Sequence, residues 1–243
     1  MGTPGINKNA SNLSKRIFRK VGKLEEVLAQ EIISILDKDI KEYQEAKLLL
    51  SGGSTPVNLY TRLSEFDINW EQVTIGLVDE RFVSADDLHS NERMIKNSLI
   101  QGKASKAKFI GLVYDAHDLN KNLELALEQN KPFFEGTSCV LLGMGTDGHT
   151  ASLFPNDKNS IDGLEEKKNS KPLIVTNAPV KPRVRISYTT EQLLKTKKLF
   201  LYFTGDEKMK VFSAAKTYNR PITTPISSFI HQQERLLEVF WTF

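Results

Sequence analysis

The sequence predicts an α/β protein with a mostly parallel, open, Rossmann-like sheet and helices on both of its faces. The chain has 243 residues, of which 40% are apolar and 26% are charged, and this is sufficient for a sizeable core. Short apolar runs alternate along the chain with stretches of helical periodicity. Such alternation of strands and helices is typical of a parallel sheet that is covered on both sides.

The first half of the chain contains the longest predicted helix, residues 24–43. It places Leu24, Leu28, Ile32 and Leu36 on one face at helical spacing. In chain order, the patterns further predict a buried strand at 47–50, a helix at 58–64, a strand at 73–78, a helix at 91–99, a strand at 109–113 and a helix at 119–129 with Leu119, Leu123 and Leu127 on one side.

The second half is dominated by short runs of branched and aromatic residues, which favour strands. These runs predict strands at 138–142, 173–175, 184–188, 199–203 and 238–242, with one further helix at 207–215. The polar stretch 156–171 predicts a mobile surface loop.

Composition narrows the class of protein. The net charge of +3 is too small to indicate nucleic acid, and no apolar run is long enough to span a membrane. Cys139 is the single cysteine, so no intrachain disulfide can form, and it is expected to be buried. We therefore expect a cytoplasmic protein.

The first 23 residues are basic. They carry Lys8, Lys15, Arg16, Arg19, Lys20 and Lys23 and no acidic residue. A targeting peptide and a nucleic-acid-binding arm are alternatives, but the segment lacks the apolar region of a secretory signal. We expect a solvated extension over residues 1–23, followed by a single catalytic α/β domain over residues 24–243.

The segment from Leu141 to Pro155 is the most informative stretch of the chain. It begins as a strand and continues into a glycine-rich turn that contains Asp147 and His149. Glycines at a strand end allow the backbone to approach a ligand closely, and histidine is the side chain most readily used as an acid or base near neutral pH. The turn therefore predicts an acid/base pair at a ligand site.

Two other strands end in segments that suit an anionic ligand. Ser51-Gly52-Gly53-Ser54-Thr55 precedes a helix, so its amides and the helix N-terminus can bind an anion; the alternative is an ordinary turn with a hydroxyl cap. It is not a Walker A loop, because no Gly-Lys-Ser/Thr follows. The strand at 73–78 ends in three charged residues, Asp79, Glu80 and Arg81. They form either a solvated loop or the mouth of the site.

Other readings of these residues are weaker. Ser152 lies three residues after His149, but a catalytic triad is rejected because no G-x-S-x-G elbow is present. The four histidines are scattered, so no metal site is predicted. Further along, Arg183, Arg185 and Lys208 are either surface charges or additional contacts for a phosphate.

Together these segments resemble the 6-phosphogluconolactonases, within the wider family that includes the glucosamine-6-phosphate deaminases. The resemblance rests on five ordered motifs: Ser51-Gly-Gly-Ser-Thr-Pro56, Val78-Asp-Glu-Arg-Phe-Val83 followed by Ser90-Asn91, Gly143-Met-Gly-Thr-Asp-Gly-His-Thr-Ala-Ser-Leu-Phe-Pro155, Arg185-Ile-Ser187 and Gly205-Asp-Glu-Lys208. Ser84 and Thr146 stand where the family commonly has proline. Arg81 replaces the tyrosine typical of the deaminases, which favours the lactonase branch.

The resemblance implies hydrolysis of 6-phospho-D-glucono-1,5-lactone to 6-phosphogluconate in the pentose phosphate pathway, without a metal or organic cofactor. It implies His149 as the base, with Asp147 either orienting it or contacting the sugar. Arg81 and Asp79 are expected at the reacting sugar. The phosphate is expected on Ser51, Gly52, Gly53, Ser54, Thr55, Arg185 and Lys208, and the choice between Arg183 and Arg185 stays open.

Two other functions are weighed against the lactonase. One is a glucosamine-6-phosphate deaminase or isomerase, and the other is a sugar-phosphate sensor that binds without turnover. Asp147 and His149 favour catalysis over the sensor. The expected partner is a small sugar phosphate, with no nucleic acid and no membrane, and the chain is expected to be a monomer or a small homo-oligomer.

Overall fold

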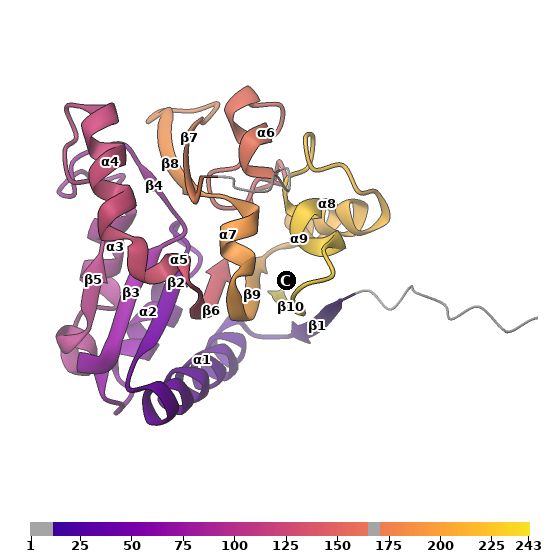
Figure 1. The fold of residues 1–243 in the computed structure, drawn as a ribbon. Helices are drawn as coiled ribbons and strands as arrows, with labels where there is room; N and C mark the ends of the chain where they lie inside the picture. The colour runs from indigo at the N-terminus through magenta and orange to yellow at the C-terminus, as the bar shows by residue number, and fades with distance from the viewer. Residues whose placement is uncertain (1–11, 165–170) are drawn as a thin grey trace, which may run out of the picture.

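A seven-stranded parallel sheet forms the centre of the molecule (Figure 1). The computed structural model describes residues 12–164 and 171–243. The strand order is β1-β10-β9-β6-β2-β3-β5, and every neighbouring pair in this sheet is parallel. Its strands are β1 (Leu13–Phe18), β2 (Ala46–Leu50), β3 (Val73–Leu77), β5 (Lys108–Ile110), β6 (Thr137–Leu142), β9 (Thr196–Thr204) and β10 (Leu237–Thr242). The predicted α/β fold with a mostly parallel sheet is confirmed.

Both faces of this sheet are covered. All six residues of β6 are buried, and because successive side chains of a strand point to opposite faces, each face must be packed. Helix α1 (Val21–Tyr43) contacts β2, β6 and β10, and it packs on α2 (Val57–Ser64). The short helix α5 (Lys131–Phe134) places Phe133 where a side chain on Gly76 would lie, so β3 and α5 pack closely.

A second sheet of three antiparallel strands lies apart from the first. It contains β4 (Asp79–Arg81), β8 (Val184–Tyr188) and β7 (Leu173–Asn177), with β8 in the middle. Figure 1 shows β7 and β8 at the top of the molecule, above the main sheet. The strands at 173–175 and 184–188 were predicted, but the sequence did not indicate the short strand at 79–81 or the separate sheet.

The remaining helices flank these sheets. They are α3 (Asn91–Ser98), α4 (Leu119–Gln129), α6 (Lys158–Leu164), α7 (Thr190–Leu194), α8 (Asp206–Thr217) and α9 (Ile226–His231), with short 3-10 turns at Trp70–Gln72 and Gly102–Lys106. The predicted strand at 109–113 is shorter than expected. Helix α6 occupies part of the stretch predicted as a loop, and residues 165–170 of that stretch lie outside the described residues. Within the described chain, no helix combines the length and apolarity needed to cross a membrane.

The expectation of a solvated N-terminal extension is wrong for residues 13–18. They form β1, which pairs in parallel with β10 from Leu13↔Leu237 to Phe18↔Thr242. Phe18 stacks on Phe240 with ring centroids 5.9 Å apart, and Arg16 pairs with Glu31 of α1. Apolar contacts and pairing therefore place this basic segment in the sheet. Residues 1–11, with Lys8, lie outside the described residues, and the assignment of residues 24–243 to a single domain stays a prediction.

Candidate active site

Five segments that follow or belong to strands meet at a cleft with a volume of ≈ 330 Å³ beyond the carboxyl ends of the main sheet. They are the turn after β2, strands β4 and β8, the glycine-rich turn after β6, and the start of α8 after β9. The cleft is lined by Ser51, Gly52, Gly53, Ser54, Thr55, Asp79, Arg81, Asn91, His149, Ser152, Phe154, Arg185, Tyr202 and Lys208, among others. This is the edge at which open α/β sheets bind ligands.

The turn after β2 presents backbone amides to the cleft. Ser51 is held from both sides, because its amide donates to the Leu141 carbonyl at 3.0 Å and its carbonyl accepts from the Tyr60 hydroxyl at 2.6 Å. Gly53 has a φ of +93°, which an L side chain rarely adopts. Within the described residues, the amides of the next four residues, 52–55, donate to no other group. Four unpaired amides before a helix form a good anion cradle.

The turn after β6 fixes the ring of His149. The Asp147 carboxylate accepts from the His149 amide at 3.0 Å, and the same Oδ1 lies 2.5 Å from His149 Nδ1. A side chain at Gly145 would collide with this ring, since its Cβ would lie 2.3 Å from two ring atoms. His149 Nε2 has no partner within the described residues, so it is the ring nitrogen that can accept a proton in the cleft.

Asp147 is therefore placed behind the histidine. Partial burial raises the pKa of Asp147, but the hydrogen bonds and charge of His149 lower it by more. The pKa of Asp147 is therefore below its ordinary value. The carboxylate thus stays ionised near neutral pH and favours the tautomer that carries its proton on Nδ1. Asp147 is the one predicted site residue that does not line the cleft.

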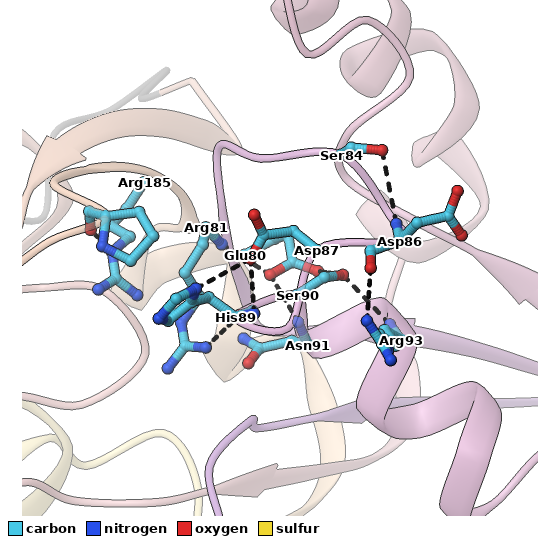
Figure 2. Close-up of polar contacts among 11 residues, drawn as sticks. Glu80, Arg81, Ser84, Asp86, Asp87, His89, Ser90, Asn91, Arg93 and Arg185 are labelled. Carbon is cyan, nitrogen blue, oxygen red and sulfur yellow. Dashed lines mark hydrogen bonds and ion pairs between the residues drawn. The ribbon is translucent and has the colours of Figure 1, made fainter.

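Arg81 and Arg185 lie directly opposite each other on the antiparallel strands β4 and β8 (Figure 2). The Arg185 Nε donates to the Pro182 carbonyl at 2.9 Å, and one Arg81 Nη donates to the His89 carbonyl. Burial and the neighbouring charge of Arg81 lower the pKa of Arg185. Two guanidinium groups held side by side repel each other, and a bound anion would relieve that repulsion.

Lys208 adds a third cation from the first turns of α8. It is half-buried, and burial lowers its pKa below the ordinary value. Within residues 12–164 and 171–243, none of Arg81, Arg185 and Lys208 forms an ion pair with a carboxylate. These three cations and the amide cradle are thus available to a phosphate.

Asp79, two residues before Arg81 on β4, also lines the cleft. It is 7% exposed, and its Oδ2 accepts from the Ser152 hydroxyl at 2.5 Å. Ser152 is itself fixed, since its amide donates to Ser187 Oγ at 3.2 Å and its carbonyl accepts from Thr176 Oγ1 at 2.6 Å. The structure therefore pairs Ser152 with Asp79 and not with His149, which agrees with the rejection of a serine triad.

The groups that line the cleft suit acid–base chemistry on an anionic substrate. In the described part of the chain, no group of three or more His, Cys, Asp or Glu side chains is arranged to hold a metal ion. The cleft offers a histidine whose Nε2 has no partner among the described residues, cations for an anion and for developing negative charge, and a buried carboxylate. Such groups suit the hydrolysis of an ester with a phosphate handle.

Comparison with known proteins decides the family. The model of the family described as "Glucosamine-6-phosphate isomerases/6-phosphogluconolactonase" matches residues 20–241. The chain belongs to this family. It is 33% identical over 226 residues to a 6-phosphogluconolactonase of Helicobacter pylori strain J99, covering 92% of this chain and 96% of that protein. It is 30% identical to a 6-phosphogluconolactonase of Rhizobium meliloti, covering 93% and 97%.

A solved structure supports the same relationship. The crystal structure of a 6-phosphogluconolactonase from Shewanella baltica superposes with a TM-score of 0.90 at 33% identity, covering 98% of this chain and 100% of that chain. A second structure, of a putative 6-phosphogluconolactonase from Neisseria gonorrhoeae, has a TM-score of 0.88 at 28% identity, covering 95% and 100%. The fold expected of this family is thus present over nearly the whole chain.

The structure brings ten of the eleven predicted site residues to the cleft, and the eleventh, Asp147, contacts His149 from behind. It also separates the two candidate arginines: Arg185 lines the cleft, whereas Arg183 is exposed and does not. Sequence reasoning assigned no role to Asn91, Phe154 or Tyr202, which line the cleft as well. The Ser90-Asn91 pair belongs to a motif of the family and could have indicated the first of them.

Proposed function

We propose that the chain hydrolyses 6-phospho-D-glucono-1,5-lactone to 6-phospho-D-gluconate in the pentose phosphate pathway. The observation that carries the proposal is that His149 Nε2, an amide cradle and three cations that form no ion pair within the described residues meet in one cleft. The names of the relatives support it.

In this proposal, the amides of Gly52 to Thr55, together with Ser51, Arg185 and Lys208, bind the phosphate. The anchored phosphate holds the lactone carbonyl near the reacting groups, so remote binding energy contributes to catalysis. His149 takes a proton from water through Nε2, and Asp147 orients the ring. The water oxygen then adds to the lactone carbonyl.

The negative charge that develops on the carbonyl oxygen is stabilised by Arg81. When the ring C–O bond breaks, the proton on His149 passes to the leaving oxygen, which becomes a free hydroxyl. The second proton of the water stays on the new carboxyl group, which releases it to solvent and becomes a carboxylate. Asp79 binds sugar hydroxyl groups or assists proton transfer. These roles require no metal or organic cofactor.

We propose a monomer or small homo-oligomer that works in the cytoplasm on a small sugar phosphate, with no nucleic acid or membrane partner. Mass measurement in solution and fractionation of cells that express the tagged chain test these points.

A lactone-hydrolysis assay corrected for spontaneous ring opening tests the activity. We expect rapid turnover of the phosphorylated lactone and far slower turnover of unphosphorylated glucono-1,5-lactone, because the latter lacks the anchor. Ammonia release from glucosamine 6-phosphate would assign the chain to the deaminase branch. Tight binding of sugar phosphates without turnover of either substrate would identify a sensor.

A further inference from the structure

Glu80 is a buried carboxylate that does not line the cleft, although it lies between Asp79 and Arg81. Its side chain is 1% exposed. Both of its oxygens are occupied by donors: Oε1 accepts from the amides of Arg81 at 2.7 Å and Asn91 at 2.8 Å. Oε2 accepts from the Glu92 amide at 2.7 Å and the Ser90 hydroxyl at 3.1 Å. Figure 2 shows this carboxylate between β4 and the start of α3.

These four donors explain how a carboxylate can be buried here. Burial raises the pKa of Glu80 to about 7, while the amides of Asn91, Glu92 and Arg81 act in the opposite direction. Two of these amides belong to the first turn of α3, where unpaired N–H groups and the helix dipole favour a negative charge. Ser90 caps the next amide, that of Arg93, at 3.1 Å. Glu80, which belongs to strand β4, thus completes the capping of helix α3.

The network continues from Glu80 to the groups that line the cleft. Asn91, the first residue of α3, donates through Nδ2 to the Asp79 carbonyl at 2.9 Å. Its Oδ1 lies 2.0 Å from the position that a Cβ on Gly52 would take, so it packs directly on the amide cradle. One carboxylate therefore joins β4, the start of α3 and, through Asn91, the turn after β2.

Arg81 is held by the same network at both ends. Its amide donates to Glu80, and its guanidinium donates to the carbonyl of His89, which lies in the loop between Arg81 and Ser90. Both ends of this loop donate to Glu80, through the Arg81 amide at its start and the Ser90 hydroxyl at its end. Loss of the carboxylate would release both ends of the loop and with them the direction in which the guanidinium points.

We propose that Glu80 is a positioning residue, which sets the place of the Arg81 guanidinium in the cleft by clamping β4 to the first turn of α3. This inference rests on the proposed lactone hydrolysis, since Arg81 is assigned to the developing oxyanion there. The competing explanation is that Glu80 only caps a helix and contributes to stability alone.

Replacement of Glu80 by Gln tests the clamp at nearly constant volume. The amide NH2 group would face two donors in place of a carboxylate oxygen, so one side of the clamp must open. We expect kcat/KM to fall roughly 10- to 100-fold, mainly through kcat. Asp39→Asn is the matched control, because Asp39 is 4% exposed and pairs with Lys197 at the other end of the sheet. It should lower the thermal midpoint and leave kcat/KM unchanged.

A double-mutant cycle separates positioning from stability. If Glu80 acts through Arg81, then Glu80→Gln should cost much less in an Arg81→Ala background than in the wild type. The matched cycle with Lys208→Met should be additive, because Lys208 comes from α8 and is not among the hydrogen-bond partners of Glu80 in the described residues. Additivity in both cycles would overturn the proposal and leave Glu80 as a helix cap.

Two further measurements keep the test decisive. If Glu80→Gln does not fold, Ser90→Ala removes one of the four donors, and we expect a smaller loss of kcat/KM with the same coupling to Arg81. Calorimetric binding of 6-phosphogluconate gives a readout without turnover, in which the dissociation constant should rise on Glu80→Gln only while Arg81 is present. A wild type that binds this product without turnover refutes the proposed function alone. A wild type that neither binds 6-phosphogluconate nor hydrolyses the lactone refutes both the proposed function and the role of Glu80.

Discussion

The two ends of the parallel sheet carry similar charges but pair them differently. The amino-end cleft, ≈ 810 Å³ in volume, is formed by Asp39, Tyr43, Glu45, Ala46, Lys47, Glu135, Gly136, Thr137, Ser138, Lys195, Thr196, Lys197 and Arg235. Its lysines are neutralised: Lys47 pairs with Glu45 at 3.0 Å, Lys195 with Glu191 at 3.7 Å and Lys197 with Asp39 at 2.8 Å. At the carboxyl end, Arg81, Arg185 and Lys208 form no such pair within the described residues.

The comparison shows that volume alone does not identify the site. The amino-end cleft is more than twice as large, ≈ 810 against ≈ 330 Å³, yet its three lysines are already paired with carboxylates. Its one arginine, Arg235, donates to the Leu194 and Glu234 carbonyls. Holding unpaired cations in a narrow cleft costs stability, as the lowered pKa values of Arg185 and Lys208 indicate. Binding of an anionic ligand offsets this loss of stability. The paired lysines at the other end are already neutralised, so an anion would stabilise them less.

Replacement of His149 by Ala is expected to have the largest effect at the carboxyl end. The turn keeps its backbone contacts, but the base is lost, so turnover should fall by roughly two orders of magnitude or more. Steady-state lactone hydrolysis and the thermal midpoint should be measured together.

The matched control is His117→Ala, since His117 is exposed and does not line the cleft. This variant should keep normal turnover. Near-normal turnover in His149→Ala with an intact fold would remove the base from the proposed mechanism.

Lys208→Met should produce the next largest effect, and it should affect mainly KM. The change removes one charge-assisted contact to the phosphate at nearly constant length, and such contacts contribute about 1.5–3 kcal/mol, or roughly 10- to 100-fold in affinity. Initial rates over a range of lactone concentrations give the two constants. An unchanged KM would show that Lys208 does not contact the phosphate.

Binding of 6-phosphogluconate should stabilise the protein against heat. At a concentration about 100 times the dissociation constant, one site contributes about 2.7 kcal/mol, which raises the midpoint by roughly 5–10 °C for a chain of this size. The rise should shrink in Lys208→Met and with added salt, because the contacts are ionic. Gluconate without the phosphate serves as the control ligand and should have little effect.

The strands themselves were readable from the sequence because an apolar run is a local property. Their partners were not, since pairing joins distant residues. Strand β8 was predicted at its observed bounds, yet it pairs with β4, about a hundred residues earlier in the chain. Strand β1 was missed because Lys15 and Arg16 obscure its apolar residues, and its partner β10 lies at the other end of the sequence.

The site was easier to predict than the sheet order. Each motif follows a strand, and the carboxyl ends of parallel strands meet at one edge, so Ser51 and His149 could be placed together without knowing which strands are neighbours. Glu80 could not be assigned, because a charged residue between two other charged residues is typical of a solvated turn. Only the antiparallel pairing of β4 with β8 and the position of α3 bury it.

Lys197→Met gives the smallest expected effect and tests the amino end of the comparison. Its ammonium pairs with the buried Asp39 and lies 3.8 Å from the centre of the Tyr43 ring, but half of the side chain is exposed. Loss of the pair should therefore lower the free energy of unfolding by about 1 kcal/mol, with no change in kcat or KM. The thermal rise caused by 6-phosphogluconate should be the same as in the wild type, because the lysines at this end are already paired with carboxylates and are not expected to bind the anion. A reduced rise would mean that the amino-end lysines also bind the sugar phosphate, and ion pairing would then no longer distinguish the two clefts.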